Sequence, residues 1–234
     1  MTKSVVVLLS GGLDSTTLAH IARKDIGKTG KIYPLSFLYG QNHVYEITRA
    51  RITAEKLGGE LRIVAVGLNS VCQSALTSGA QAVPEAGGSD EIPPTWVPQR
   101  NAIFLSLAFA YAETVEADAV YIGVNAVDYS GYPDCRPEFT QAMEKALNLA
   151  SKRFVTEGRG IGLLTPLIKL KKTEIIEKGL SLGVNYADTW SCYKGPNPKG
   201  EACGVCDSCA IRLKAFADLG QVDPLKYEAR SEGK

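Results

Sequence analysis

The chain begins with a short apolar run that leads through two glycines into a helical pattern. Residues 5–9, V-V-V-L-L, form the continuous β-branched run that is typical of a buried parallel strand. Ser10-Gly11-Gly12 follows as a turn, and residues 18–23 continue as a helix with Asp14 or Ser15 near its first turn. A strand, a glycine turn and a helix in this order place the helix N-terminus beside the end of the strand.

The glycine turn is suited to binding phosphate. Gly11 and Gly12 adopt backbone angles that other residues resist, and they let a ligand approach the chain closely. The N–H groups of the turn and the helix N-terminus form an anion site, to which Ser10, Ser15 and Thr16 add hydroxyl groups. Two glycines alone would also fit an ordinary tight turn. The whole string S-G-G-x-D-S-T directly after a strand favours the phosphate site.

The same string resembles the pyrophosphate loop of the ATP pyrophosphatases, which make adenylates. It is not a Walker loop, because no G-K-[ST] follows it. The resemblance implies that the loop holds the β and γ phosphates of ATP as a leaving group, with AMP and pyrophosphate as products. The loop residues predicted to bind ATP are Leu8, Leu9, Ser10, Gly11, Gly12, Leu13, Asp14, Ser15, Thr16, Thr17 and Leu18.

Composition narrows the class of protein. The formal net charge of +1 over 234 residues offers no basic surface for a long nucleic acid, so small-molecule partners are expected. No apolar run reaches 18 residues, so no membrane span is expected, and the first strand begins too early for a signal peptide. Six cysteines, four of them close to the C-terminus, favour a metal site in a reducing cytoplasm over a disulfide framework.

Strands and helices alternate along most of the chain. Strands are predicted at 32–39, 61–66, 119–124 and 160–167, and helices at 44–57, 100–113, 139–154 and 173–182. This order predicts an α/β fold with a doubly wound, mostly parallel sheet. The resemblance of the loop implies that the sheet is of the adenine nucleotide alpha hydrolase type. Residues 1–188 are predicted to form the ATP-binding domain. Residues 189–234 are predicted to form a zinc-knuckle and C-terminal helix segment that packs on this domain.

Ligands of such sheets bind at the carboxyl ends of the strands. The Ser10 loop lies at one of these ends, and adenine is expected near Leu38 and Tyr39 at another. Arg100 opens a helix and is a candidate clamp for phosphate or carboxylate. Lys172 precedes a helix and is a candidate to reach the ATP phosphates. Arginine and lysine also occur at helix starts without a ligand.

Two segments have no regular pattern. Residues 67–98 are rich in Gly, Ser and Pro, and a loop of this length predicts either a cover over the active site or a subunit contact. A homodimer is therefore left open. Residues 227–234 are polar and are expected to fray.

A polar and aromatic run follows the predicted strand at 119–124. Residues 125–139 read N-A-V-D-Y-S-G-Y-P-D-C-R-P-E-F. A guanine-like ring presents two donors that suit a carboxylate and a flat face that suits a tyrosine. The predicted substrate-binding residues are Asp128, Tyr129, Tyr132, Asp134 and Arg136; a polar turn with aromatic packing is the alternative. Cys135 has no histidine near it in sequence, so it is expected to form a pocket wall rather than a nucleophile.

Four cysteines form the pattern C-x10-C-x2-C-x2-C: Cys192, Cys203, Cys206 and Cys209. Four thiolates satisfy tetrahedral Zn²⁺ in a closed structural site, which leaves no position for a reacting water. One structural Zn²⁺ per chain is therefore predicted, with the role of fixing the C-terminal segment against the core. An iron–sulfur cluster is the rival ligand.

Taken together, six motifs resemble the 7-cyano-7-deazaguanine (preQ0) synthase family of queuosine biosynthesis. They are S-G-G-L-D-S-T-T, V-P-Q-R-N, D-Y-S-G-Y-P-D-C-R-P-E-F, T-P-L, T-W-S-C-Y and the four cysteines, in this order between about residues 4 and 219. The resemblance implies an ATP-dependent carbon–nitrogen ligase. Such an enzyme would convert 7-carboxy-7-deazaguanine and ammonia to the nitrile through adenylate and amide intermediates. The predicted catalytic residues are Ser10, Asp14, Ser15, Arg100 and Lys172, with Mg²⁺ on the phosphates near Asp14.

Two other functions fit part of the pattern. A tRNA-thiolating ATP pyrophosphatase shares the loop and often the cysteines, but it needs a reactive thiol and a surface for RNA. A non-catalytic zinc-knuckle module would explain the four cysteines and nothing else. Free ammonia is the expected nitrogen source, because the chain starts with Met-Thr and has no room for a glutaminase domain.

Overall fold

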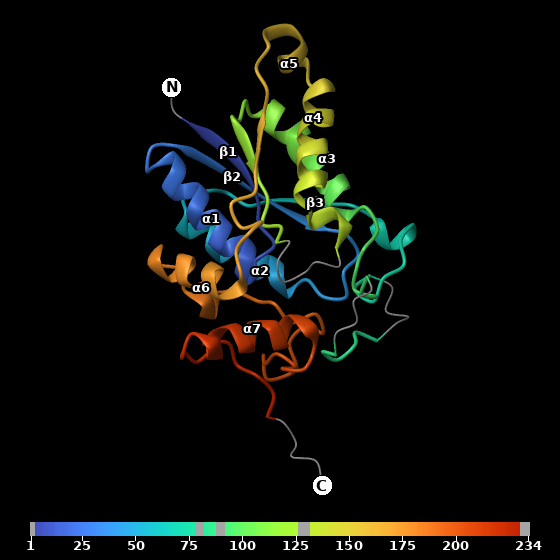
Figure 1. The fold of residues 1–234 in the computed structure, drawn as a ribbon, viewed down its shortest axis with the longest axis vertical. Helices are drawn as coiled ribbons and strands as arrows, with labels where there is room; N and C mark the ends of the chain where they lie inside the picture. Colours follow the sequence, from blue (N-terminus) through green and yellow to red (C-terminus); the bar gives the residue numbers. More distant parts are fainter. Residues whose placement is uncertain (1–2, 78–81, 88–91, 126–131, 230–234) are drawn as a thin grey trace.

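Five parallel strands form one sheet in the computed structural model, which describes residues 3–77, 82–87, 92–125 and 132–229 (Figure 1). The strands are β1 (Ser4–Leu8), β2 (Lys31–Leu38), β3 (Arg62–Ala65), β4 (Ala119–Tyr121) and β5 (Gly162–Leu164). Their order across the sheet is β3-β2-β1-β4-β5. The chain thus builds outward from β1 to β3 and then returns to the other side of β1, which confirms the predicted doubly wound parallel sheet.

Helices cover both faces of this sheet (Figure 1). They are α1 (Leu13–Ile26), α2 (Tyr45–Lys56), α3 (Arg100–Thr114), α4 (Pro137–Leu149), α5 (Lys152–Glu157), α6 (Lys172–Ser181) and α7 (Asp207–Asp218). Short 3-10 turns span Leu68–Ser70, Pro133–Cys135 and Tyr186–Asp188. Helices α1, α2 and α6 lie on one face and α3 and α4 on the other, while α7 packs beyond α6.

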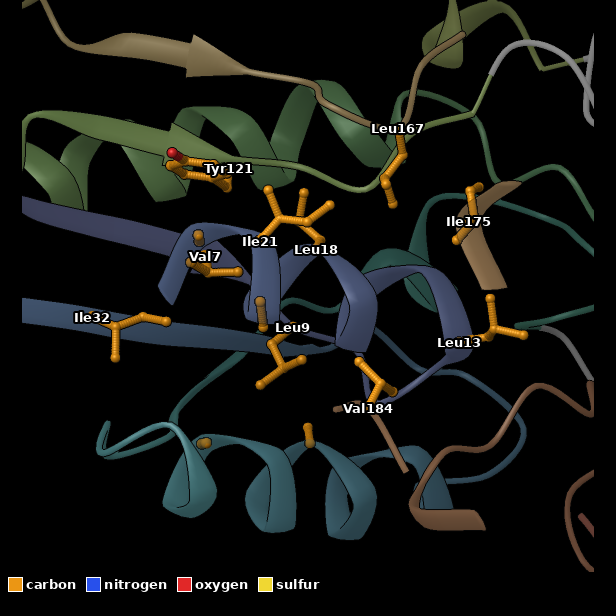
Figure 2. Packing of buried hydrophobic residues seen from close by; sticks show 14 of the residues in the cluster. Val7, Leu9, Leu13, Leu18, Ile21, Ile32, Tyr121, Leu167, Ile175 and Val184 are labelled. Atoms are coloured by element: carbon orange, nitrogen blue, oxygen red, sulfur yellow. The ribbon is translucent and has the colours of Figure 1, made fainter. Parts of the chain in front are cut away.

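The run at the start of the chain is apolar throughout because both faces of β1 are covered. Val5, Val7 and Leu9 pack into the cluster around α1 and α6, part of which Figure 2 shows. Val6 and Leu8 point the opposite way, into the cluster around α3. Burying one such side chain stabilises the fold by roughly 1.5–3 kcal/mol. The strand therefore anchors both halves of the core.

Three predicted elements differ clearly from the structure. Strand β4 ends at Tyr121, whereas the strand was predicted over 119–124. The helix expected over 139–154 is two helices: α4 ends at Leu149 with Ala150 as its C-cap, and Ser151 caps the start of α5. The Ser151 hydroxyl accepts a hydrogen bond from the Phe154 N–H at 3.3 Å and donates to Glu113 at 3.0 Å. Strand β5 is shorter than the predicted 160–167 and covers three residues, ending before Thr165-Pro166.

The C-terminal segment is tied to the glycine loop. The N–H of the fully buried Trp190 donates to the Gly11 carbonyl at 3.0 Å. The tail was expected to fray from residue 227, which is wrong for its first residues. Tyr227 forms a bridge with Ala202, and its hydroxyl donates to Asp223 at 2.6 Å.

The described parts of the long loop pack against this C-terminal segment and the sheet. Glu85 forms an antiparallel bridge with Cys206, and the Ala86 N–H donates to the Val205 carbonyl at 2.8 Å. Nearer the sheet, the Leu76 carbonyl accepts a hydrogen bond from the Asn42 N–H at 2.9 Å.

Candidate active site

A cavity of about 290 Å³ lies where β1, β2 and β4 end. Ser10 lines it after β1, Tyr39 after β2 and Gly123 after β4. The connections from β1 and β4 leave the sheet in different directions, so the cavity sits at the topological switch point, the usual ligand position of a doubly wound sheet. Its walls therefore come from segments far apart in sequence.

The glycine loop is organised around one hydroxyl. The Ser15 Oγ accepts hydrogen bonds from the backbone N–H groups of Ser10 at 3.2 Å and Gly11 at 3.1 Å, and it lies 2.9 Å from the Ser10 Oγ. The Ser10 Oγ in turn accepts from the Gly12 N–H at 3.2 Å. These bonds fix the loop at the N-terminus of α1 and use the N–H groups of Ser10, Gly11 and Gly12 within the loop. The helix N-terminus and the two serine hydroxyls are the parts of the loop that suit an anion.

Gly11 is required by its conformation and by its neighbour. Its φ of +94° lies in the left-handed region. A Cβ at this position would overlap the Glu46 carbonyl oxygen and lie 2.7 Å from the Ala50 nitrogen. The first turns of α2 therefore press directly against the loop.

Asp14 and Lys172 meet in the wall of the cavity. The Lys172 ammonium lies 2.7 Å from each carboxylate oxygen of Asp14, and both residues line the cavity. Lys172 is buried at the start of α6, while Asp14 is half-buried in the first turn of α1. The pair joins two elements 158 residues apart and places a cation beside the anion loop.

The residues predicted to bind ATP divide into two groups. Those that line the cavity are Leu8, Leu9, Ser10, Gly12, Leu13, Asp14, Ser15 and Tyr39; those that do not are Gly11, Thr16, Thr17, Leu18 and Leu38. Leu18 lies in the hydrophobic core. The Thr17 hydroxyl donates to the Leu13 carbonyl at 3.0 Å and lies 2.8 Å from the Tyr186 hydroxyl. Residues after the first turn of α1 point away from the cavity because the helix turns them toward its packed face.

Aromatic rings and Arg100 form the opposite wall. Phe37 and Phe104 stack with ring centroids 4.0 Å apart, and the Tyr39 ring meets Phe104 edge-on at 5.5 Å. The Arg100 guanidinium lies 5.9 Å from the Tyr39 ring centroid. The wall thus combines a flat apolar surface with a cation, and adenine near Tyr39 and a clamp role for Arg100 stay predictions.

The predicted substrate-binding residues are separated by the structure. Asp128 and Tyr129 fall outside the described residues. Tyr132 lines the cavity, and its hydroxyl lies 2.8 Å from the Thr95 hydroxyl. Asp134 is buried behind the lining: its Oδ2 accepts from the Asn101 N–H at 3.2 Å, and its Oδ1 has no hydrogen-bond partner among the residues described. Arg136 is exposed at the N-terminus of α4 and does not line the cavity.

Cys135 is a wall residue of this cavity. Its thiol lies 3.7 Å from the Asn101 Nδ2, and burial raises its pKa to about 11. A thiol with that pKa is protonated at neutral pH and is a poor nucleophile.

Two cavity residues, His43 and Glu46, belong to none of the sequence motifs. His43 follows β2, and its Nε2 lies 2.9 Å from the Cys192 carbonyl oxygen. Glu46 lies in the first turn of α2, and burial raises its pKa to about 7, against the opposing charge of Arg100. The position of both residues just beyond the end of a central strand is the one signal that points to them.

The C-terminal segment also supplies lining residues, among them Trp190, Ser191, Tyr193 and Arg212. Arg212 of α7 holds that wall together. Its guanidinium donates to both Asp223 oxygens at 2.7 and 2.9 Å and to the Thr189 hydroxyl at 2.7 Å. Both members of the Arg212–Asp223 ion pair are buried.

The four predicted metal ligands are brought together at the base of this segment. The sulfur atoms of Cys192, Cys203, Cys206 and Cys209 all lie within 4.8 Å of one another. Tetrahedral Zn²⁺ with bonds of about 2.3 Å needs sulfur atoms roughly 3.8 Å apart, so the cluster fits that metal.

Backbone N–H groups point at two of the clustered sulfur atoms. The Cys203 N–H points to the Cys192 sulfur at 3.5 Å, and the Cys206 N–H points to the Cys203 sulfur at 3.4 Å. The three sulfur atoms of Cys192, Cys206 and Cys209 share hydrogen bonds, which lower the pKa of the Cys206 thiol and raise the pKa values of the other two. Metal binding requires deprotonated sulfur, so this donor set is suited to a metal ion.

In the described part of the chain, no helix combines the length and apolarity needed to cross a bilayer.

Comparison with known proteins gives a match over nearly the whole chain. The 7-cyano-7-deazaguanine synthase of Citrifermentans bemidjiense is 52% identical over 229 residues, covering 97% of this chain and 99% of that protein. The synthase of the same name from Geobacter sulfurreducens is 50% identical over 235 residues, covering 100% and 97%. Among solved structures, NMN synthetase from Francisella tularensis is similar with a TM-score of 0.49 and 20% identity, covering 94% of this chain and 78% of that one.

The family model described as "Queuosine biosynthesis protein QueC" matches residues 4–220, a span that includes the glycine loop, the cavity wall and all four clustered cysteines. With this match and relatives at about half identity over their full length, the chain is a member of the QueC family of queuosine biosynthesis proteins.

Proposed function

We propose that the chain is a 7-cyano-7-deazaguanine synthase, which converts 7-carboxy-7-deazaguanine, ammonia and ATP to the nitrile with release of AMP and pyrophosphate. The observation that carries this proposal is the identity of 50–52% to relatives of that name over almost the full length of both chains. The cavity supports it, because an anion loop and a flat aromatic wall face the same space.

The first step activates a poor electrophile. A carboxylate oxygen of the substrate attacks the α phosphorus of ATP, and pyrophosphate leaves. The N-terminus of α1, the hydroxyl groups of Ser10 and Ser15 and the Lys172 ammonium would stabilise the charge that gathers on the leaving phosphates. Arg100 would hold the substrate carboxylate or the α phosphate from the opposite wall. This step requires orientation and charge stabilisation and no protein nucleophile.

The later steps reuse the same cavity. Ammonia attacks the acyl carbon, AMP leaves, and an amide is formed. The amide oxygen is then adenylated by a second ATP. Loss of the two nitrogen protons and departure of the second AMP leave the nitrile. One cavity at the switch point serves both adenylations, and it is the basis for proposing a single site.

Recognition of the deazaguanine ring is assigned to the segment after β4. Tyr132 lines the cavity and would contact the ring. Asp134 has one buried carboxylate oxygen without a hydrogen-bond partner among the described residues, and it stays a proposed acceptor for the ring although it lies behind the lining. Asp128, Tyr129 and Arg136 remain proposed contacts, on sequence grounds alone.

Two metal ions are part of the proposal. The Cys192, Cys203, Cys206 and Cys209 sulfurs would hold a structural Zn²⁺, which would fix residues 189–234 against the ATP-binding domain of residues 1–188. Asp14 would help to hold Mg²⁺ with the ATP phosphates, since carboxylates and phosphates are its usual ligands. Mg²⁺ supplies charge neutralisation on the phosphates. We further propose that the enzyme works in the cytoplasm on small molecules.

Incubation of the purified protein with ATP, Mg²⁺, ammonium and 7-carboxy-7-deazaguanine tests this function. Mass spectrometry should find the nitrile, and nucleotide analysis should find AMP rather than ADP. A product that stops at the amide would make the enzyme a simple amide ligase. Sulfur transfer to tRNA would instead support a tRNA-thiolating enzyme.

A further inference from the structure

Glu46 is a carboxylate of the cavity that the steps described above do not use. Two carboxylate side chains line the cavity in the described part of the chain, Asp14 and Glu46. Both oxygens of Asp14 are bound by the Lys172 ammonium. Within residues 3–77, 82–87, 92–125 and 132–229, no hydrogen bond or ion pair engages the Glu46 carboxylate. Glu46 thus offers an acceptor to whatever enters the cavity.

The backbone of α2 fixes Glu46 beside the anion loop. The Glu46 carbonyl oxygen packs directly on Gly11, so closely that only a glycine fits there. Glu46 lies in the first turn of α2 and lines the same cavity as the glycine loop and Tyr39. A group held here lies near the phosphates that the loop would bind, and therefore near the reacting carbon.

The charges around Glu46 suit a proton acceptor. The Arg100 guanidinium of α3 is the charge that acts on it, and burial together with the Glu46 charge raises the pKa of Tyr39 at the end of β2. Burial raises its pKa to about 7, and the nearby Arg100 charge opposes that rise. A carboxyl group with this pKa exchanges a proton readily at neutral pH, which is the property of an efficient general base.

We propose that Glu46 binds ammonium in this cavity and accepts a proton from it, so that the nitrogen can attack the adenylated substrate. The inference rests on the function proposed above and names the residue that handles its nitrogen source. At neutral pH almost all ammonia is protonated to ammonium, and ammonium has no lone pair with which to attack. A carboxylate without another partner attracts the cation, and its position beside the loop directs the nitrogen toward the acyl adenylate.

The atoms and charges of this step balance. One N–H bond of ammonium breaks, and its proton passes to the Glu46 carboxylate. The freed lone pair forms the C–N bond with the acyl carbon, the C–O bond to the adenylate breaks, and AMP leaves with the electron pair. The nitrogen then carries three hydrogens and releases one to water, which leaves the neutral amide.

Three assays on Glu46→Gln separate nitrogen handling from the other steps. Pyrophosphate–ATP exchange with 7-carboxy-7-deazaguanine and no ammonia reports adenylation. Amide formation from ammonium chloride reports the step assigned to Glu46. Hydroxamate formation from hydroxylamine reports attack by a nucleophile that is already largely uncharged at neutral pH. Glu55→Gln is the matched control, since Glu55 lies exposed on the same helix.

The expected result is selective. Glu46→Gln should retain exchange and hydroxamate formation, and it should lower amide formation from ammonium by about 10²–10⁴-fold at neutral pH. The deficit should shrink in alkaline buffer as free ammonia rises, and Glu46→Asp should recover part of the rate. Glu55→Gln should match the wild type in all assays.

Two results would overturn the inference while leaving the proposed function intact. One is a Glu46→Gln enzyme with unchanged amide formation and an unchanged pH profile. The other is an equal loss in all three assays, or a raised Mg²⁺ requirement for exchange, which would assign Glu46 to ATP or its metal ion. A wild-type enzyme without exchange would overturn the proposed function and this inference together.

Discussion

Gly11→Ala should be far more damaging than an ordinary glycine substitution. The residue has a φ of +94°, and left-handed backbone costs a residue with a Cβ roughly 1–2 kcal/mol. The new methyl group would also overlap the Glu46 carbonyl oxygen and lie 2.7 Å from the Ala50 nitrogen. Both are backbone atoms, so α2 would have to move, and such overpacking costs about 1–3 kcal/mol. The expected loss is about 2–5 kcal/mol of unfolding free energy.

Gly158→Ala is the control for the backbone contribution. Gly158 caps α5 with a φ of +68°, and a Cβ there would meet nothing within 4 Å. Its substitution should therefore cost only the conformational part, about 1–2 kcal/mol. The difference between the two variants isolates the packing of α2 on the loop.

Urea unfolding of both variants, followed by circular dichroism, measures these losses, and pyrophosphate–ATP exchange measures the effect on the site. Gly11→Ala should lose both stability and exchange, whereas Gly158→Ala should keep exchange. Equal stability of the two variants would refute the claim that α2 is pressed against the loop. Full exchange in Gly11→Ala would refute the placement of the anion site.

Three further predictions follow from single contacts. Asp14→Asn removes the charge that faces Lys172 and the phosphates. Since a charged hydrogen bond contributes about 1.5–3 kcal/mol, AMP formation should fall by about 10- to 100-fold. An unchanged AMP yield would contradict this role. The wild type should carry about one Zn²⁺ per chain, and Cys206→Ala should lower both the zinc content and the melting temperature. Metal analysis that finds iron and sulfide in the wild type would rule out zinc. Asp223→Asn removes the charge from a buried ion pair in which Arg212 donates to both carboxylate oxygens. Breaking such a pair costs about 3–5 kcal/mol of unfolding free energy. A loss below about 1 kcal/mol would show that the fold does not need the pair.

The sheet could be predicted because its signal is local. Residues 5–9 are apolar without interruption since both faces of β1 are buried, and the glycine loop follows directly. The four cysteines were equally informative, because thiolates at that spacing have few other uses. The break between α4 and α5 was missed because Ser151 at the end of a helical pattern also fits an uninterrupted helix.

The rest of the site depends on contacts between distant segments. Glu46 belongs to the first turn of a helix, where an acidic residue is ordinary, and only the packing of α2 on Gly11 brings it to the cavity. Trp190 and Arg212 enter the wall because the cysteine segment folds back onto the loop. Lys172 was expected near phosphate, but its pairing with Asp14 spans 158 residues and has no sequence signature.

The central claim is that one cavity carries out both adenylations, and the carboxamide of 7-deazaguanine tests it most directly. Supplied with ATP and Mg²⁺ but no ammonia, the carboxamide should yield the nitrile with one AMP for each product molecule. The carboxylate should require ammonia and release two AMP for each nitrile, and Tyr132→Ala, which alters the shared wall, should weaken both reactions together. An inert carboxamide, while the carboxylate still reaches the nitrile, would contradict the account.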